Sequence, residues 1–445
     1  MKKNILLLGD YIVDEFLEDL CEIDSDYKVS HIYVLNVTPR QEKIINNNNI
    51  EVIKGWHDFT SLIHEDFNTD ILSDPKLKEQ AFNIIKNFYR FSDNQDFFYH
   101  ENVYYELVNY WIHFFKKNKI DLIIGGNPSF LESITTMVAE KIFGIRTITR
   151  KLLSRQPEDN SYRMYFFDNK NEMAIPLHLD KEFKIESLLF PDYSKLKFKK
   201  RPKILVEIVR ALINFKVSSL LFIFGNVLNF FKLKKDIKNM VISPDLDTDF
   251  IYYPLHFDPE IVTMPEEDVR ANQGLNIKKL AASLPKDWIL YVKIHPNQFN
   301  FKLNFWVWEF YGNVMKYYMS FQNIYYLSQI PNVKFIDTSI SQKELIQSSK
   351  SIASISGSVF LEASFYQKPI LVFGKKTLYK QLNNSFFVES NKEIKEAIEE
   401  FQKDKVYDSN IESIFQNYTY SSKTTFKKEI LHELILYLTN SKTKP

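Results

Sequence analysis

Three short stretches in the second half of the chain carry side chains suited to binding a phosphorylated ligand. They are Pro254–Glu260, Lys293–Gln298 and Ser356–Glu362, and each follows a run of apolar residues that predicts a buried strand. Loops that follow parallel strands gather at the carboxyl edge of a sheet, so we expect these stretches to meet there. Together they supply two histidines, a lysine, carboxylates and two serine hydroxyls.

The last stretch has the pattern of a turn between a strand and a helix. The apolar run Ser351–Ile355 stops at Ser356-Gly357-Ser358, and a helical pattern containing Glu362 follows. The two serines add hydroxyl donors, and a glycine lets a phosphate approach the backbone closely. Glu362, about one turn into the helix, is placed to accept hydrogen bonds from a ribose. The alternative is an ordinary helix cap, where serine is also favoured.

The histidines and the lysine of the other two stretches extend this set. His295, held by Pro296 directly after a strand, is the expected phosphate ligand, although a packed structural histidine is the alternative. Lys293 either points to the same ligand or is solvated at the end of its strand. His256 stands between two prolines and either contacts the ligand or supports the loop. A nucleotide-sugar needs this mixture of donors, a ribose acceptor and positive charge on the leaving phosphate.

Carboxylates near strand ends are the candidates for acid–base chemistry. Asp258 and Glu260 either bind hydroxyls of the donor sugar or cap the turn that follows them. Asp10 and Asp14 follow the first strand of the other half, from which a general base would deprotonate an acceptor hydroxyl. Asp10 has the alternative role of capping the next helix.

Several classes of site are excluded by the residue pattern. No set of His, Asp and Glu has the close spacing of a dedicated metal site, and the glycine-rich dinucleotide and P-loop fingerprints are absent. We therefore expect a nucleotide-sugar donor but neither a metal nor a cofactor. The chain has 57 basic and 56 acidic residues, which provides no electrostatic case for nucleic acid as a partner. Its one cysteine excludes an internal disulfide framework and fits a reducing cytoplasm.

The first half alternates strand and helix patterns, which predicts a mostly parallel sheet covered on both faces. The expected strands are Asn4–Leu8, His31–Val37, Ile50–Ile53, Ile120–Ile124 and Ile145–Thr149. The expected helices are Tyr11–Leu20, Pro75–Tyr89, Val103–Lys117 and Phe130–Phe143. A hairpin of Met164–Phe167 with Met173–Pro176 follows.

A basic and apolar block separates the two halves. Lys195–Lys203 is strongly basic, and Val206–Phe231 contains the uncharged run Val217–Phe231 with lysines on both sides. This run is shorter than the roughly 20 residues that span a bilayer, so the block predicts a helix lying in the membrane interface with its basic flanks on anionic lipid. The alternative is a buried helix hairpin linking two domains.

The second half repeats the strand and helix alternation. The expected strands are Phe250–Tyr253, Trp288–Lys293, Val333–Ile336, Ser351–Ile355 and Ile370–Phe373, and the expected helices include Asp268–Ser283, Asn304–Leu327, Glu393–Gln402 and Thr424–Leu438. We expect domains at 1–200 and 242–445, with the helical linker 201–241 between them.

The motifs in this half, taken in order, resemble the capsule polysaccharide biosynthesis proteins, a family that includes bacterial Kdo transferases. The motifs are YYPLHFDPE, Asn272-Gln273, AASLPKDWILYVKIHPNQ, IPNVKFID and SISGSVFLEASFYQKPILVFG. The resemblance covers Ile251–Gly374 and, more faintly, Ile120–Thr149. It implies a GT-B-like α/β fold, in which two Rossmann-like domains with parallel sheets face each other across a cleft and the C-terminal domain binds the donor.

Related bacterial sialyltransferases bind a CMP-sugar with a His-Pro motif and a serine pair. His295-Pro296 and the pair Ser356/Ser358 match them, so the resemblance favours a CMP-sugar over the UDP-sugar alternative. Ser129, after Asn127-Pro128, stands where many relatives have a histidine, which leaves the acceptor side open.

We therefore expect a cytoplasmic glycosyltransferase, peripheral at the inner face of the membrane. It would move Kdo or a related acidic sugar onto a capsular polysaccharide or its lipid-linked precursor. A UDP-N-acetylglucosamine 2-epimerase is the alternative in the same fold, although it needs no lipid contact. A non-catalytic glycan-assembly scaffold and a CDP-glycerol-type phosphotransferase are further alternatives.

Overall fold

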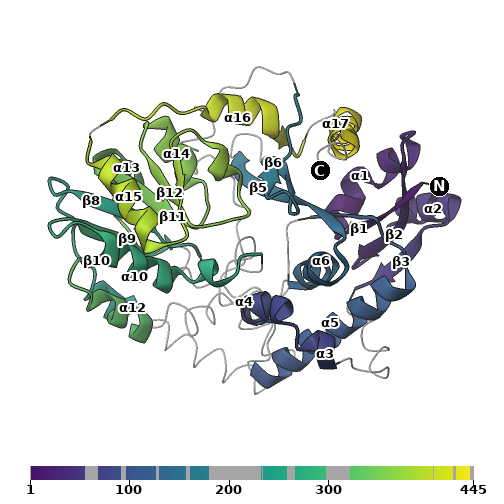
Figure 1. Ribbon diagram of the computed structural model, residues 1–445, viewed down its shortest axis with the longest axis horizontal. Coiled ribbons are helices and arrows are strands. Elements are labelled where there is room, and N and C mark those ends of the chain that lie inside the picture. Colours follow the sequence, from purple (N-terminus) through teal and green to yellow (C-terminus); the bar gives the residue numbers. More distant parts are fainter. Residues whose placement is uncertain are drawn as a thin grey trace, which may run out of the picture.

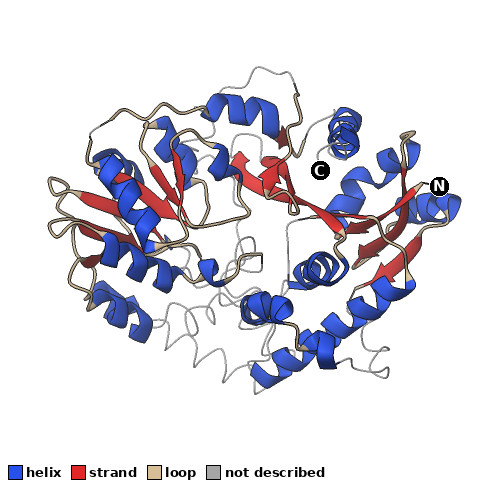
Figure 2. Ribbon diagram, in the orientation of Figure 1, coloured by secondary structure: helices blue, strands red, loops and turns tan. Residues whose placement is uncertain are grey.

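The computed structural model describes residues 2–55, 69–91, 97–126, 130–156, 161–179, 232, 234–257, 266–296, 321–403, 405–423 and 427–440. These residues form two β-sheets, each with helices packed on it (Figures 1 and 2). The block Val206–Phe231, expected to contact a membrane, lies outside the described residues, as does most of Asn304–Leu327. Within the described part of the chain, no helix is both long and apolar enough to cross a membrane.

The first sheet is built on five parallel strands. They are β1 (Lys3–Leu8), β2 (Tyr27–Val34), β3 (Glu51–Lys54), β4 (Leu122–Gly125) and β5 (Arg146–Gln156). Their order, β3-β2-β1-β4-β5, is that of a Rossmann sheet. All five strands are parallel, and the order in which the chain adds strands to the sheet reverses between β1 and β4. The continuous apolar run of β1 is buried, as expected for a strand covered on both faces.

Helices cover both faces of this sheet. They are α1 (Asp10–Glu22), α2 (Pro39–Asn48), α3 (Thr69–Leu72), α4 (Pro75–Phe91), α5 (Phe97–Lys117) and α6 (Phe130–Phe143). Because side chains alternate along a strand, Ile5 and Leu7 pack in one core with α1, while Leu6 and Leu8 pack in the other with α4, α5 and α6.

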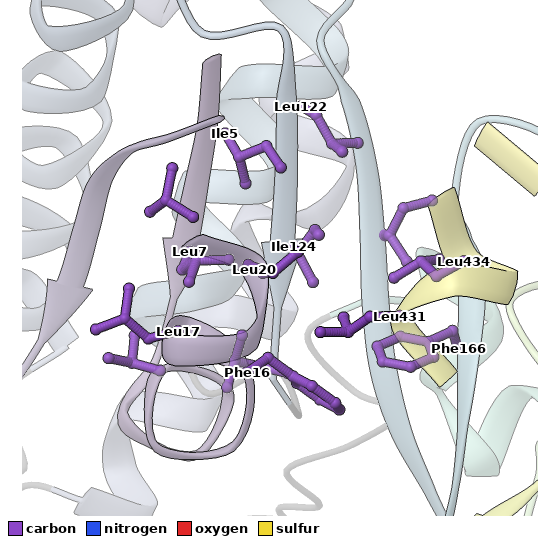
Figure 3. Packing of buried hydrophobic residues seen from close by; sticks show 14 of the residues in the cluster. Ile5, Leu7, Phe16, Leu17, Leu20, Leu122, Ile124, Phe166, Leu431 and Leu434 are labelled. Atoms are coloured by element: carbon purple, nitrogen blue, oxygen red, sulfur yellow. The ribbon is translucent and has the colours of Figure 1, made fainter. Parts of the chain in front are cut away.

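The first sheet also has an antiparallel extension. The strand β6 (Ser161–Asp168) pairs with β7 (Met173–Ala174), which is the expected hairpin, and also runs antiparallel to β5, which the sequence did not predict. The late strand β14 (Tyr420–Ser421) pairs with β6. The last helix, α17 (Lys427–Asn440), then packs Leu431 and Leu434 into the core that contains Phe16 and Phe166 (Figure 3).

The elements β14 and α17 therefore belong to the first domain, whereas the expected boundaries put all of 242–445 in the second. The apolar face of α17 was evident from its sequence. Which surface that face covers is decided by the tertiary structure, because a helical pattern does not identify its neighbour.

The second sheet has only parallel strands among the described residues. They are β8 (Phe250–Pro254), β9 (Ile289–Lys293), β10 (Val333–Ile336), β11 (Ser351–Ser354), β12 (Ile370–Val372) and β13 (Ser385–Phe387), in the order β10-β9-β8-β11-β12-β13. This is again the Rossmann order, with the reversal between β8 and β11. The expected fold class is confirmed: the chain is α/β, with two Rossmann-like domains in a GT-B-like combination.

The connecting elements of the second domain are mostly short. They are η3 (Val269–Ala271), α10 (Gln273–Ser283), α12 (Phe321–Ser328), α13 (Gln342–Ser348), α14 (Val359–Phe365), η5 (Leu378–Gln381), α15 (Asn391–Phe401) and α16 (Ile411–Tyr418). The helix expected over Asp268–Ser283 is divided at Asn272. The side chain of Asn272 accepts the Leu275 N–H at 3.0 Å and so caps α10.

A set of buried and partly buried charged residues joins the two domains; we call it the interdomain ion cluster. Its members are Glu140, Lys151, Glu266, Glu267 and Lys376. The ammonium of Lys151 contacts the carboxylate of Glu266, with side-chain exposures of 3% and 6%, and also donates to the Lys376 carbonyl at 2.6 Å. The Lys376 N–H donates to Glu267 Oε1 at 2.8 Å, and its ammonium lies 3.3 Å from Glu140.

Helix α4 holds the same segment from the first domain. Gln80 donates to the carbonyl of Glu266 at 2.8 Å, and Asn83 donates to the carbonyls of Glu267 and Asp268 at 2.9 and 2.7 Å. The segment that leads from the end of β8 toward α10 is thus anchored on the other domain.

We expect Lys151→Met to destabilise the protein by about 3–5 kcal/mol, because it leaves the Glu266 carboxylate buried without its cation. Denaturant unfolding measures the loss. The control is Lys392→Met, whose pair with Glu396 is exposed and contributes about 0.3–0.5 kcal/mol. Similar losses in the two variants would contradict a stabilising role for the buried pair.

Candidate functional site

The candidate site lies at the carboxyl edge of the second sheet, where the strand order reverses between β8 and β11. The loops that leave these strands contact each other: the Ser356 N–H donates to His256 Nε2 at 3.3 Å, and Ser354 Oγ lies 3.1 Å from the same nitrogen. The ring of His295, after β9, lies 5.8 Å from the ring of Phe257, after β8. The three stretches therefore meet as expected, which parallel strands impose on the loops that follow them.

His256 is held in a defined orientation. A backbone N–H can only donate, so the bond from Ser356 makes Nε2 an acceptor and places the proton of the neutral ring on Nδ1. The backbone of His256 is fixed by Gln273, which accepts its N–H at 2.7 Å and donates to its carbonyl at 3.4 Å. His256 therefore supports the serine turn, and Gln273, which was not among the expected site residues, supports His256.

The turn at Gly357 requires glycine for two reasons. Its φ is +123°, a conformation that residues with a side chain rarely adopt, and a Cβ there would lie 3.3 Å from His256 Cε1. Ser358 is the residue directly before α14, but its side chain makes no capping bond, so it does not act as an ordinary cap. Within the described part of the chain, the backbone N–H groups of Gly357, Ser358 and Val359 have no acceptor.

A partly buried carboxyl, that of Glu362, and a buried amine, that of Lys293, lie beside this turn. Burial raises the pKa of Glu362 to about 7, against the opposing effects of a 2.9 Å hydrogen bond from Gln342 and the charge of Lys293. Burial lowers the pKa of Lys293, which Asp337 and Glu362 partly offset, and its ammonium donates to the Ile340 carbonyl. Lys293 is only 7% exposed, so it is not a solvated lysine at a strand end.

The remaining expected residues of this edge are placed only in part. His295 is half-buried and Pro296 is exposed, both directly after the buried Ile294. Asp258 and Glu260 lie outside the described residues. Among the residues that are described, no group of three or more His, Cys, Asp or Glu side chains could hold a metal ion.

The two aspartates of the first domain have different surroundings. Asp10 is the first residue of α1, and its Oδ1 accepts the Leu35 N–H at 2.9 Å, which connects the ends of β1 and β2. Asp14 is exposed and accepts a hydrogen bond from Gln41, which also forms the capping box of α2 with Thr38. Asp10 therefore lies at the carboxyl edge of the first sheet, whereas Asp14 points toward α2.

One acidic residue at this edge was not predicted from the sequence. Glu132 lies in the first turn of α6, directly after β4, and a Cβ on Gly9 would stand 3.4 Å from its Oε1. A signal for it existed, because Phe130-Leu131-Glu132 repeats the Phe360-Leu361-Glu362 of the second half.

No protein-family model matches the chain, and no curated protein matches its sequence. Among solved structures, it is similar to a UDP-GlcNAc 2-epimerase from Neisseria meningitidis bound to UDP-GlcNAc, with 12% identity, a TM-score of 0.28 and coverage of 98% of this chain and 99% of that one. It is also similar to Anabaena Alr3699/HepE in complex with UDP, with 12% identity, a TM-score of 0.29 and full coverage of both chains.

A third similar structure is the glycotransferase of kitacinnamycin, with 9% identity, a TM-score of 0.24 and coverage of 100% of this chain and 99% of that one. With TM-scores this low, we draw nothing from these likenesses about the substrate of this chain. The fold assignment rests on its own strand order.

The raised pKa of Glu362 predicts a specific pH dependence of stability. In the folded protein this carboxyl holds its proton up to about pH 7. Its ordinary pKa is 4.5, so the unfolded chain releases the proton at a lower pH than the folded protein does. The stability due to the protonated form is complete below pH 4.5 and is lost as the pH rises through 7. Relative to Glu362→Gln, the wild type should lose about 3 kcal/mol over this interval.

Denaturant unfolding of both proteins between pH 4.5 and 8 measures this difference. Glu396→Gln, at an exposed position of α15, is the control and should run parallel to the wild type. Parallel curves for the wild type and Glu362→Gln would contradict the assignment.

Substitution of Gly357 tests the packing of the serine turn. Gly357→Ala should destabilise the protein by about 1–3 kcal/mol through its backbone and also displace the His256 ring. Gly144→Ala is the control, since Gly144 has φ +63° and an added Cβ would meet no described atom within 4 Å, so only the backbone cost applies. Imidazole ¹⁵N signals of His256 should shift in the first variant alone. An unchanged His256 signal in Gly357→Ala would overturn this account of the turn.

Proposed function

We propose that this chain is a glycosyltransferase of the GT-B type, which binds a nucleotide-sugar in its second domain and transfers the sugar to an acceptor held by the first. One observation supports this more than any other. At the reversal point of the second sheet, a turn whose three N–H groups have no acceptor among the described residues lies beside the partly buried carboxyl of Glu362. The turn suits a phosphate, and the carboxyl suits a pair of ribose hydroxyls.

The proposed roles follow from the chemistry of each group. The N–H groups of the turn and the hydroxyls of Ser356 and Ser358 donate to the phosphate. His295 adds positive charge as the bond between sugar and phosphate breaks and negative charge develops on the leaving phosphate. Glu362 accepts hydrogen bonds from the ribose. His256 supports the turn by accepting the Ser356 N–H, and the charge of Lys293 favours the ionised form of Glu362.

Ionisation of Glu362 is part of this proposal. An ionised carboxylate accepts hydrogen bonds with both oxygens, whereas a protonated carboxyl must donate one. Bound ribose therefore favours the ionised form. Because the pKa of free Glu362 is about 7, nucleotide affinity rises as the pH increases toward that value.

The donor we propose is a CMP-sugar, carrying Kdo or a related acidic sugar, with a UDP-sugar as the alternative. When the sugar of a CMP-sugar is transferred, the leaving group is CMP, which carries a single phosphate. A histidine and backbone N–H donors can stabilise its charge without a metal. The acceptor we propose is a capsular polysaccharide or its lipid-linked precursor. The basic and apolar block Lys195–Phe231 would then hold the enzyme at the inner face of the membrane.

Transfer requires a general base for the acceptor hydroxyl. Asp10 is our first candidate, since it lies at the carboxyl edge of the first sheet, and Asp14, Asp258 and Glu260 are the others. The base takes the hydroxyl proton, the acceptor oxygen bonds to the anomeric carbon, and the bond from that carbon to the phosphate oxygen breaks with its electrons on the nucleotide.

A nucleotide-sugar 2-epimerase is the second candidate, because the site in the second domain would serve it equally well. The two activities differ in their products. An epimerase interconverts UDP-sugars in the absence of any acceptor, whereas a transferase releases the free nucleotide.

We expect purified protein to be stabilised by CMP more than by UDP, GDP or CDP, without added divalent metal. His295→Ala and Ser356→Ala should each weaken CMP binding about 10- to 150-fold, the value of one hydrogen bond to a charged group. Thermal shift and calorimetry measure both effects. His432→Ala, at an exposed position of α17, is the control.

A strict need for magnesium or manganese, or a preference for UDP, would overturn the choice of a CMP-sugar. Unchanged CMP affinity in both His295→Ala and Ser356→Ala would contradict the proposed phosphate site.

A further inference from the structure

The loop between β10 and α13 lies beside the candidate site, although none of the expected site residues belongs to it. It spans Asp337–Ser341 and leaves the same carboxyl edge of the second sheet as the serine turn. Asp337 Oδ1 accepts the Ser339 N–H at 2.8 Å, and Ser341 caps α13 by accepting the Glu344 N–H. Hydrogen bonds therefore hold the loop at both of its ends.

Lys293 ties this loop to the neighbouring strand. It is the last residue of β9, which pairs with β10, and its ammonium donates to the Ile340 carbonyl. The same ammonium acts on Glu362 through its charge. Lys293 therefore anchors the backbone two residues before Gln342 and also favours the ionised form of Glu362.

Gln342 is the first residue of α13, and its side chain reaches Glu362. Its Nε2 donates to Glu362 Oε1 at 2.9 Å. Leu345 and Ile346, three and four residues further on, lie on the same face of α13 as Gln342. They pack in one core with Leu361 of α14 (Figure 1). The packing of the two helices therefore sets the distance between the amide and the carboxyl.

The other groups around Glu362 act on it without a hydrogen bond. Lys293 contributes its charge, and the phenols of Tyr252 on β8 and Tyr379 in η5 stay neutral near pH 7, because burial raises their pKa. Helix α16 packs on α14 with apolar side chains. Among the described residues, only Gln342 donates a hydrogen bond to the carboxyl. An amide N–H can only donate, so this bond favours the ionised carboxylate.

We propose that Gln342 is a positioning residue for nucleotide binding, which holds Glu362 by one oxygen in the orientation and the ionised form that accept the ribose hydroxyls. This rests on the proposed function and specifies how the site recognises a ribonucleotide. Glu362 is partly exposed, and an ionised carboxylate has about four acceptor positions, so those that remain suffice for two hydroxyls.

The test compares CMP with 2′,3′-dideoxy-CMP, which has the same base and phosphate but lacks both ribose hydroxyls. Calorimetry on the full-length protein between pH 6 and pH 9 gives the ratio of the two affinities, in which effects on the phosphate cancel. In the wild type this preference for CMP should rise with a midpoint at about pH 7, where Glu362 ionises.

Gln342→Leu should move this midpoint up by about 1–2 pH units, the value of one hydrogen bond to a charged group. Its preference for CMP should then be about 5- to 50-fold below that of the wild type at pH 7 and approach the wild-type value at pH 9. Gln342→Lys, which places a cation beside the carboxyl, should move the midpoint to a lower pH. Loss of folding cannot produce opposite shifts in the two variants. Gln347→Leu, at an exposed position of the same helix, is the matched control and should keep the wild-type profile.

The outcomes separate this role from the proposed function. If the wild type binds neither CMP nor UDP, the proposed function is overturned, and the role of Gln342 with it. If only UDP binds, the same comparison is made with UDP and 2′,3′-dideoxy-UDP. Nucleotide binding with the same pH profile in the wild type and Gln342→Leu would overturn the role of Gln342 and leave the nucleotide site standing. So would an equal loss of affinity for both nucleotides at every pH, because the loop would then support the whole site. A wild type without preference for the ribose form would remove Glu362 and Gln342 together from ribose recognition.

Discussion

Parallel strands can be joined only by crossovers that run over a face of the sheet, and this constraint shapes both domains. In each sheet the chain leaves the first strand in one direction and later returns on its other side. In the first domain, α1 and α6 therefore lead away from the neighbouring strands β1 and β4. In the second domain, the turn into α14 leads away from β11 beside the loop that follows β8. The candidate site of the second domain and Asp10 of the first domain lie at these points.

Burial determines the electrostatics of the site in the second domain. Glu362 and Lys293 are removed from water together, which raises the pKa of the carboxyl and lowers that of the amine. Their mutual attraction opposes both shifts without cancelling them. Near neutral pH the carboxyl is therefore poised between its two forms, so a ligand that favours one form can fix it. An exposed glutamate would be fully ionised and would lack this sensitivity.

Burial also determines the role of the interdomain ion cluster, but there the charges have partners, and the cluster stabilises the structure. The charges of Lys151, Glu266 and Lys376 are each surrounded by partners, and Gln80 and Asn83 satisfy the carbonyls of the adjoining backbone. A cluster of this kind stabilises one arrangement of the two domains, because any other arrangement leaves charges buried without partners. The return of β14 and α17 to the first sheet adds a covalent and a packed connection to the same arrangement. The segment after β8 is thus held at one end by the contacts of His256 within the second domain, and at the other by the contacts of Glu266 with Lys151 and Gln80 of the first.

The sequence by itself determined most of the strands, most of the longer helices and the serine turn, whereas the short strands β13 and β14 were not predicted. Strands such as Val333–Ile336 and helices such as Phe130–Phe143 appear where their patterns placed them, because burial on two faces or on one face leaves a distinct spacing of apolar residues. The meeting of three loops also followed from the sequence, since parallel strands bring their carboxyl ends to one edge. Tertiary structure alone decided the antiparallel pairing of β5 with β6, the placement of α17, the support of His256 by Gln273 and the position of Glu132 over Gly9. A spacing pattern states which face of an element is apolar but not what covers that face. A residue type states that a group can ionise, but the surrounding protein decides how far burial moves its pKa.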